Sequence, residues 1–226
     1  GNGMSIEEWI KYGPSESLLL FMYYTPKKAK KLYYDVIPKH VDEYLRYLKQ
    51  FDSQSDFEKL NNPIIHIHSD KIPKAEIDIS FSLILNLVSA CQSDDKNIIW
   101  NYIKEYIPKS NPSNNPYTDK LVEFSIQYYK DFVEPNKKYK KPSEEEKKIL
   151  EELINVLKGF KKNASSEEVQ TEIYELGKKS KYELKDWFLF LYEILLGQKN
   201  GPRLGTFILL LSIKETIKLI EDSFSR

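Results

Sequence analysis

Apolar residues recur at helical spacing along most of this chain. Between Pro38 and Phe51 the apolar side chains lie three or four positions apart, which places them on one face of a helix. They are Val41, Tyr44, Leu45 and Leu48. Three further helical stretches are expected: Phe81 to Ala90, from a cap at Asp94 to Ile107, and about Thr118 to Val133. The pattern predicts an all-α fold, a multi-helix bundle.

Helix start signals support this prediction at four places. In the motif Ser-x-x-Glu, the serine hydroxyl and the glutamate carboxylate each accept a hydrogen bond from a free backbone N–H of the first turn. The pairs are Ser5 with Glu8, Ser143 with Glu146, Ser165 with Glu168, and Ser212 with Glu215. The lysine-rich run 137–141 between two such helices is expected to be a solvated connector.

Residues 53–79 are the irregular part of the chain. In the segment Ile64–His68, between Pro63 and Pro73, isoleucine and histidine alternate from Ile65 onwards, and this predicts one short strand. Continuous helices begin after about residue 77. We therefore expect a small helix-loop-strand region over residues 1–75 and a helical domain over residues 76–226.

His66-x-His68-x-Asp70 is the only arrangement that resembles a metal site. On a strand the three side chains would point the same way, and two imidazoles with one carboxylate can hold zinc. The position that would complete a metal-binding signature is Lys71, and the chain has only one other histidine, His40. Hydrogen-bonded structural imidazoles are therefore the favoured interpretation, and no metal site is predicted.

Composition narrows the function classes. Thirty-four basic and thirty-four acidic residues give the 226-residue chain a formal net charge of zero, which argues against a nonspecific DNA-coating protein. The single cysteine, Cys91, excludes an internal disulfide and a thiolate-rich zinc site. No apolar run approaches the roughly 20 residues of a membrane-spanning helix. A cytoplasmic protein that makes no membrane contact is expected.

No catalytic constellation is recognisable. The chain lacks the phosphate-binding patterns G-x-x-x-x-G-K-[ST] and G-x-G-x-x-G and the nucleophile motif G-x-S-x-G. We therefore expect no catalytic residue and no cofactor in this chain, and composition alone leaves open whether it is part of an enzyme.

Two cationic features remain. Lys27, Lys28, Lys30 and Lys31 are clustered, and like charges on one helix disfavour it unless an anion is near. Phosphate backbone is such an anion, and plain solvation is the alternative. The second feature is Arg203 within the segment 201–205, at the expected start of an apolar helix, where a bound phosphate would be favourable.

Several segments, taken in order, resemble the class I lysyl-tRNA synthetases. The matching segments are Ser5–Trp9, Pro14–Tyr23, Pro26–Tyr33, Asp35–Pro38 with Val41–Tyr44, His66–His68, Phe81–Ala90 and Leu191–Gly197 leading into Gly201–Gly205. The family's catalytic motifs, of the types H-I-G-H and K-M-S-K-S, are missing. The residues Gly1-Asn2-Gly3 are similar to those that follow the second motif, so His66 and His68 are not the histidines of the first.

The resemblance implies a stem-contact region followed by a helical cage that binds the anticodon of tRNA(Lys). It implies that a Rossmann catalytic domain using ATP and Mg²⁺ belongs to the same protein, which is expected to be a monomer. The lysine cluster at residues 27–31 would then contact the tRNA stem. A helical protein–protein scaffold is the alternative from another function class.

For the anticodon, the expected contacts are Lys185, Trp187, Phe188, Lys199 and Arg203. Trp187 and Phe188 are adjacent on a helix and cannot both face the same core, so one ring is available to stack on a base. Gly201 and Gly205 would allow close backbone approach. The competing interpretation is that Gly205 serves helix packing and that Arg203 pairs with Glu193 or Asp186.

Overall fold

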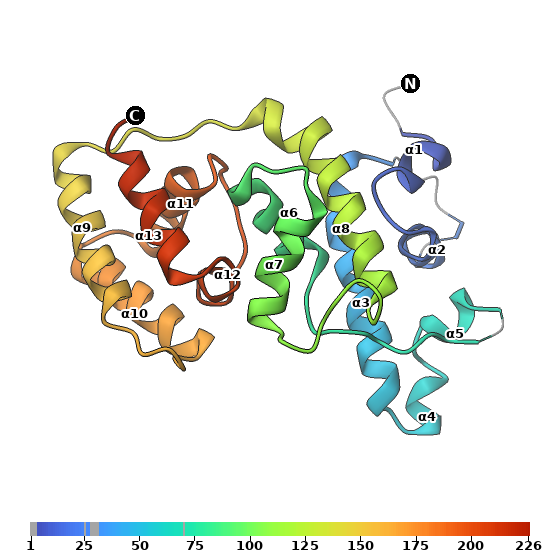
Figure 1. Ribbon diagram of the computed structural model, residues 1–226. Helices are drawn as coiled ribbons and strands as arrows, with labels where there is room; N and C mark the ends of the chain where they lie inside the picture. Colours follow the sequence, from blue (N-terminus) through green and yellow to red (C-terminus); the bar gives the residue numbers. More distant parts are fainter. Residues whose placement is uncertain (1–3, 25, 28–31, 70) are drawn as a thin grey trace. The chain divides into compact units, whose positions relative to one another are not determined.

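The computed structural model describes residues 4–24, 26–27, 32–69 and 71–226. Over these residues the chain forms helices and loops with no strand, so the all-α prediction is confirmed (Figure 1). None of the helices in this described part is long and apolar enough to cross a membrane.

The helices are α1 Ile6–Ile10, α2 Ser15–Tyr23, α3 Ile37–Ser53, α4 Asp56–Lys59, α5 Ile64–Ile67, α6 Phe81–Cys91, α7 Lys96–Tyr106, α8 Pro116–Tyr128, α9 Glu144–Lys158, α10 Ser166–Lys179, α11 Leu184–Leu195, α12 Leu204–Leu211 and α13 Ile213–Ser223. Short 3₁₀ turns occur at Tyr34–Val36 and Glu134–Asn136, and a π-helical turn, Tyr129–Val133, follows α8. The predicted helix to Val133 thus changes its winding at Tyr129.

The chain divides into two compact units. Unit 1 comprises residues 1–85 and 109–132, and unit 2 comprises residues 86–108 and 133–226. The expected division, into a region over residues 1–75 and a helical domain over residues 76–226, stays a prediction.

The core of unit 1 forms where α2, α3 and α5 pack together. Leu20, Tyr44, Leu48 and Ile64 are its fully or almost fully buried members. Tyr44 and Leu48 lie on one face of α3, as the spacing predicts. Pro38 lies in the first turn of α3, where its missing N–H costs no helical hydrogen bond.

The strand predicted from Ile64 to His68 is wrong, because this segment is the helical turn α5. Pro63 has φ −59° and ψ −19°, which directs the chain into a helix. The side-chain carbonyl of Asn62 accepts a hydrogen bond from the backbone N–H of Ile64 at 3.0 Å, so the first turn is capped locally. In such a short segment, alternation of apolar and polar residues does not distinguish a strand from a single turn.

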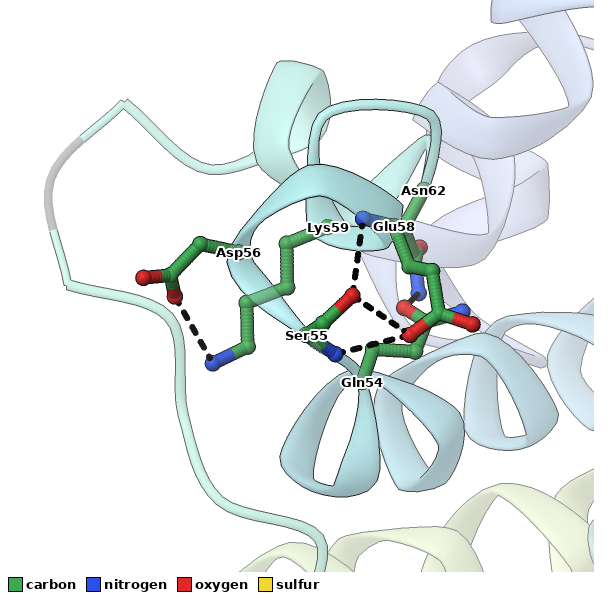
Figure 2. Close-up of polar contacts among 6 residues, drawn as sticks. All are labelled: Gln54, Ser55, Asp56, Glu58, Lys59 and Asn62. Carbon is green, nitrogen blue, oxygen red and sulfur yellow. Dashed lines mark hydrogen bonds and ion pairs between the residues drawn. The ribbon is translucent and has the colours of Figure 1, made fainter.

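A further capping box begins α4 (Figure 2). The Ser55 N–H donates to the Glu58 carboxylate at 2.8 Å, and the Glu58 N–H donates to the Ser55 hydroxyl at 3.4 Å. Lys59 lies 3.9 Å from Asp56, and the Asn62 amide donates to Gln54 at 2.9 Å. Sequence reasoning missed this box, although Ser55-x-x-Glu58 has the same spacing as the motifs it identified.

Unit 2 is built from α7 and α9–α13, with α12 packed against both α7 and α10. The predicted capping boxes at Ser143 and Ser165 are confirmed, as is the box at Ser5 in unit 1. At Ser212 the hydroxyl accepts from the Glu215 N–H at 3.3 Å. Asp95, rather than the predicted Asp94, caps α7, with its carboxylate accepting from the Asn97 N–H at 2.8 Å.

The segment 137–141 is extended, but it is not the solvated connector that was predicted. The Lys137 ammonium donates to the Ser89 carbonyl at 2.7 Å, and the Lys138 N–H donates to the Gly197 carbonyl at 2.8 Å. The Lys140 N–H donates to the Glu193 carbonyl at 3.2 Å. Burial lowers the pKa of Lys137 to about 8. Tertiary contacts therefore hold this lysine-rich segment against unit 2.

Candidate nucleic-acid interface

The predicted stem patch lies largely outside the described residues. Lys27 is described and is exposed. Lys28, Lys30 and Lys31 fall outside the described part of the chain, so the stem contact stays a prediction from the sequence.

The two histidines of the candidate metal motif contact aromatic side chains. The His66 ring stacks on Tyr23 with centroids 5.4 Å apart, and a ring nitrogen of His68 lies 3.1 Å from the Tyr44 hydroxyl. Asp70 lies outside the described residues. Among those described, no group of three His, Cys, Asp or Glu side chains could hold a metal ion. The contacts seen for His66 and His68 hold α5 against α2 and α3.

Trp187 belongs to the core of unit 2. Its side chain has no exposed area, and its indole N–H donates to the Ile173 carbonyl at 2.9 Å. Gly177 of α10 lies directly against the ring, since a Cβ there would be 2.4 Å from a Trp187 carbon. A base cannot stack on the Trp187 ring as it lies here.

Phe188 is the partly exposed ring of the adjacent pair. It lies on α11 one position from Trp187, and its ring centroid is 6.5 Å from that of Tyr192. Lys185 and Lys199 are exposed and make no ion pair within the described part of the chain. We refer to the candidate contacts that are exposed or partly exposed between α11 and the start of α12 as the α11–α12 surface: Lys185, Phe188, Lys199 and Arg203.

Arg203 is exposed, but it has an anionic partner. Its guanidinium lies 3.1 Å from the Glu167 carboxylate, in the first turn of α10. This partner is neither Glu193 nor Asp186, the two acids considered from the sequence. A phosphate that bound Arg203 would have to compete with Glu167.

Gly205 is a packing residue. Its N–H donates to the Gln170 side chain at 2.8 Å, and a Cβ at this position would lie 2.1 Å from the Ser166 carbonyl oxygen. The residue is buried where α12 meets α10. Close approach to a nucleotide at Gly205 is therefore excluded in this arrangement, whereas Gly201 is exposed.

Unit 1 contains a cavity of about 350 Å³ lined by residues of α3, of the segment 73–80 and of α8. Two of its carboxylates already serve as helix caps. Asp42 accepts from the Phe81 N–H at 2.6 Å, and Glu76 accepts from the N–H groups of Tyr117 and Thr118 at 2.9 Å. These acids fix the starts of α6 and α8 and leave the cavity wall mostly apolar.

Two segments of the chain match known protein families. Residues 1–71 match the family described as tRNA synthetases class I (K), and residues 112–223 match the family described as anticodon binding domain. The chain is 49% identical over 225 residues to the lysine–tRNA ligase of Rickettsia bellii (strain OSU 85-389), covering 98% of this chain and 43% of that relative. The lysine–tRNA ligase of Rickettsia felis is 47% identical over 224 residues, with the same coverage.

The chain thus spans less than half of the length of these relatives. The two family matches follow the order of the segments that carry the resemblance in the sequence. The chain belongs to the class I lysyl-tRNA synthetase family.

Proposed function

We propose that this chain is the tRNA(Lys)-binding portion of a class I lysine–tRNA ligase, with unit 2 contributing to anticodon recognition. The observation that carries this proposal is the match of residues 112–223 to the anticodon binding domain. Residues 133–223 of that match form most of unit 2, a compact helical unit. In this unit Lys185 and Lys199 are exposed and the Phe188 ring is partly exposed. Unpaired bases of an RNA loop are recognised by such rings together with edge hydrogen bonds.

The whole ligase would supply the chemistry that this chain lacks. A Rossmann catalytic domain of the same protein would bind ATP, Mg²⁺ and lysine, in the cytoplasm and as a monomer. The stem contacts would lie within residues 1–75, at Lys27, Lys28, Lys30 and Lys31. The helical domain, residues 76–226, would meet the anticodon through the α11–α12 surface, with Trp187 supporting Phe188 from the core rather than stacking on a base.

An interaction scaffold is the second candidate, and one observation favours it. Ile6 and Ile10 of α1 and Leu19 and Met22 of α2 are exposed to between 45% and 60%. Exposed apolar side chains on neighbouring helices are typical of a protein contact. On the leading proposal, this face would meet another part of the ligase.

Binding of labelled tRNA(Lys) by the 226-residue chain, followed by fluorescence anisotropy, separates the two candidates. We expect tRNA(Lys) to bind more tightly than a tRNA(Lys) whose anticodon uridines are replaced, because the bases are read directly. Equal affinities for the two RNAs, or no binding of either RNA, would contradict anticodon recognition. Changing Ile6 and Leu19 to Ser should leave RNA affinity unchanged, and a fall in the affinity of that variant would place the RNA on unit 1's apolar face.

A further inference from the structure

A groove in unit 2 lies between the end of α9 and one face of α13; it is open to solvent and has a volume of about 680 Å³. Its apolar lining consists of Leu157, Phe160, Ile213 and Ile217. Its charged lining consists of Lys158, Lys162, Lys214, Lys218 and Glu221. Cavities of about 300–1,000 Å³ are those that hold small organic groups, so the groove has room for a nucleotide. We call it the α9–α13 groove.

The groove is strongly cationic, although the chain as a whole is neutral. Four lysines and one glutamate give its lining a formal charge of +3, from four positive charges less one. All four lysines are exposed, and none makes an ion pair within the described part of the chain. Lysines elsewhere in unit 2 do have acidic partners, for example Lys147 with Glu144 and Lys178 with Glu175. The groove therefore gathers four lysines that have no ion-pair partner among the described residues, beside the single carboxylate of Glu221.

Two of these lysines lie where a helix disfavours them. Lys214 and Lys218 are four positions apart on α13, so their like charges repel each other. Lys214 also lies in the first turn of α13, where the helix dipole opposes a cation. Glu221, three positions after Lys218, offsets part of this repulsion, and an anion bound between the two lysines would remove the rest.

Phe160 gives the groove an aromatic wall. It follows the C-cap Gly159 of α9, its N–H donates to the Leu157 carbonyl at 3.3 Å, and its side chain is only partly buried. It is the only aromatic residue in the lining of this groove. An apolar ring beside unpaired cations suits a ligand that carries both a flat base and a phosphate.

We propose that the α9–α13 groove binds single-stranded RNA, with an unstacked base against Phe160 and the flanking phosphates on Lys158, Lys162, Lys214 and Lys218. This inference rests on the proposed function and names a second surface of unit 2 that contacts nucleotides of the unpaired loop of the tRNA. It adds a binding surface separate from the α11–α12 surface. An acidic protein segment would satisfy the charges but would leave the ring unused.

The lysines are tested by changing all four to Gln in the 226-residue chain. Gln keeps the helix propensity and most of the side-chain length while it removes the charge. A matched control changes Lys147, Lys148, Lys178 and Lys179 to Gln, which removes the same net charge from the same unit. Binding of the isolated anticodon stem-loop of tRNA(Lys) is measured at several salt concentrations.

The groove variant should lower the slope of log K against log salt by about 0.7 for each phosphate that no longer meets a lysine, or up to about 2.8 for four phosphates. The control should keep a slope close to that of the parent. An unchanged slope in the groove variant, or an equal fall in the control, overturns the inference while the proposed function stands. No binding of either tRNA(Lys) or the stem-loop by the parent chain overturns both.

Phe160 is tested with two substitutions that preserve packing. Phe160→Leu removes the aromatic face and should weaken stem-loop binding about fivefold or more, whereas Phe160→Tyr should stay within about twofold of the parent. Equal affinities of the Leu and Tyr variants overturn the stacking contact. Poly-glutamate is the probe for a protein partner: tighter binding of poly-glutamate than of the stem-loop, abolished in the groove variant, assigns the groove to an acidic protein and overturns the inference.

Discussion

The α11–α12 surface and the α9–α13 groove both combine cations with an aromatic residue, but they differ in what those groups already contact. On the first surface, Arg203 is paired with Glu167. Trp187, next to the partly exposed Phe188 in the sequence, is buried and hydrogen-bonded in the core. In the groove, the lysines have no acidic partner within the described residues, and Phe160 lies in the open wall. Sequence reasoning pointed to the first surface, where Lys185 and Lys199 are unpaired within the described residues but Arg203 is not, whereas all four lysines of the second are unpaired there.

The type of a residue therefore does not by itself show whether it is free to bind a ligand, because a contact within the fold can already occupy it. An arginine near a helix start suggests phosphate binding, but a nearby glutamate from another helix can occupy it first. Exposed ion pairs are worth only about 0–1 kcal/mol, so Glu167 can be displaced from Arg203 at small cost. The lysines of the groove need no such exchange, and we expect them to dominate the salt dependence of RNA binding.

The largest effect on the free energy of unfolding should come from Trp187. Trp187→Ala removes a fully buried ring and its hydrogen bond to Ile173, and should lower the free energy of unfolding by about 3–5 kcal/mol. Urea denaturation followed by circular dichroism measures this decrease. Phe188→Ala, one position along α11, should cost much less because its side chain is partly exposed.

The core role of Trp187 would be contradicted if Trp187→Ala kept the stability of the parent and weakened only RNA binding. Such a result would place the Trp187 ring on the RNA and return the stacking role to the residue first considered for it. A fall in stability with unchanged affinity at a temperature where the variant is folded would confirm its core role.

A smaller effect on stability is expected at Gly205. Gly205→Ala would put a methyl group 2.1 Å from the Ser166 carbonyl oxygen, so α10 and α12 would have to move apart. Overpacking of this kind costs about 1–3 kcal/mol. Gly159→Ala is the matched control, since Gly159 has φ −76° and its nearest neighbour to an added Cβ is 3.3 Å away. Thermal unfolding of both variants measures the difference, and equal melting temperatures would contradict the packing role of Gly205.

Much of the fold could be predicted from the sequence because helix starts are encoded locally. Ser5, Ser143 and Ser165 each carry their capping partner three residues further along, and all three boxes form. The strand over Ile64–His68 was predicted wrongly because so short an alternation is too weak to outweigh the helical turn that Pro63 begins. The segment 137–141 could not be placed, since its contacts are with Ser89, Glu193 and Gly197.

The candidate surfaces were harder to predict than the fold. The sequence did hold a signal for the burial of Trp187: it shares a helical stripe with Phe190, Leu191 and Ile194, and all four are buried. The groove left no comparable signal, because Lys158 and Lys162 lie more than fifty positions from Lys214 and Lys218. Only the packing of α13 against α9 brings the two pairs together.

The smallest expected effect concerns Lys137, whose ammonium is partly buried and hydrogen-bonded, unlike the exposed lysines of the α9–α13 groove. Burial lowers the pKa of the Lys137 ammonium to about 8 in the folded chain, below the value of about 10.4 for an unfolded lysine. Between these two pH values the unfolded chain holds a proton that the folded chain has released, so rising pH favours the folded state.

The parent should therefore gain stability relative to Lys137→Met as pH rises from 8 towards 10. The gain should be modest, because Lys137 is not fully buried and its ammonium is hydrogen-bonded to the Ser89 carbonyl. Urea denaturation of both proteins at pH 7, 8, 9 and 10 measures the difference. A difference that stays constant or falls with pH would show that Lys137 is as open to water as the lysines of the α9–α13 groove.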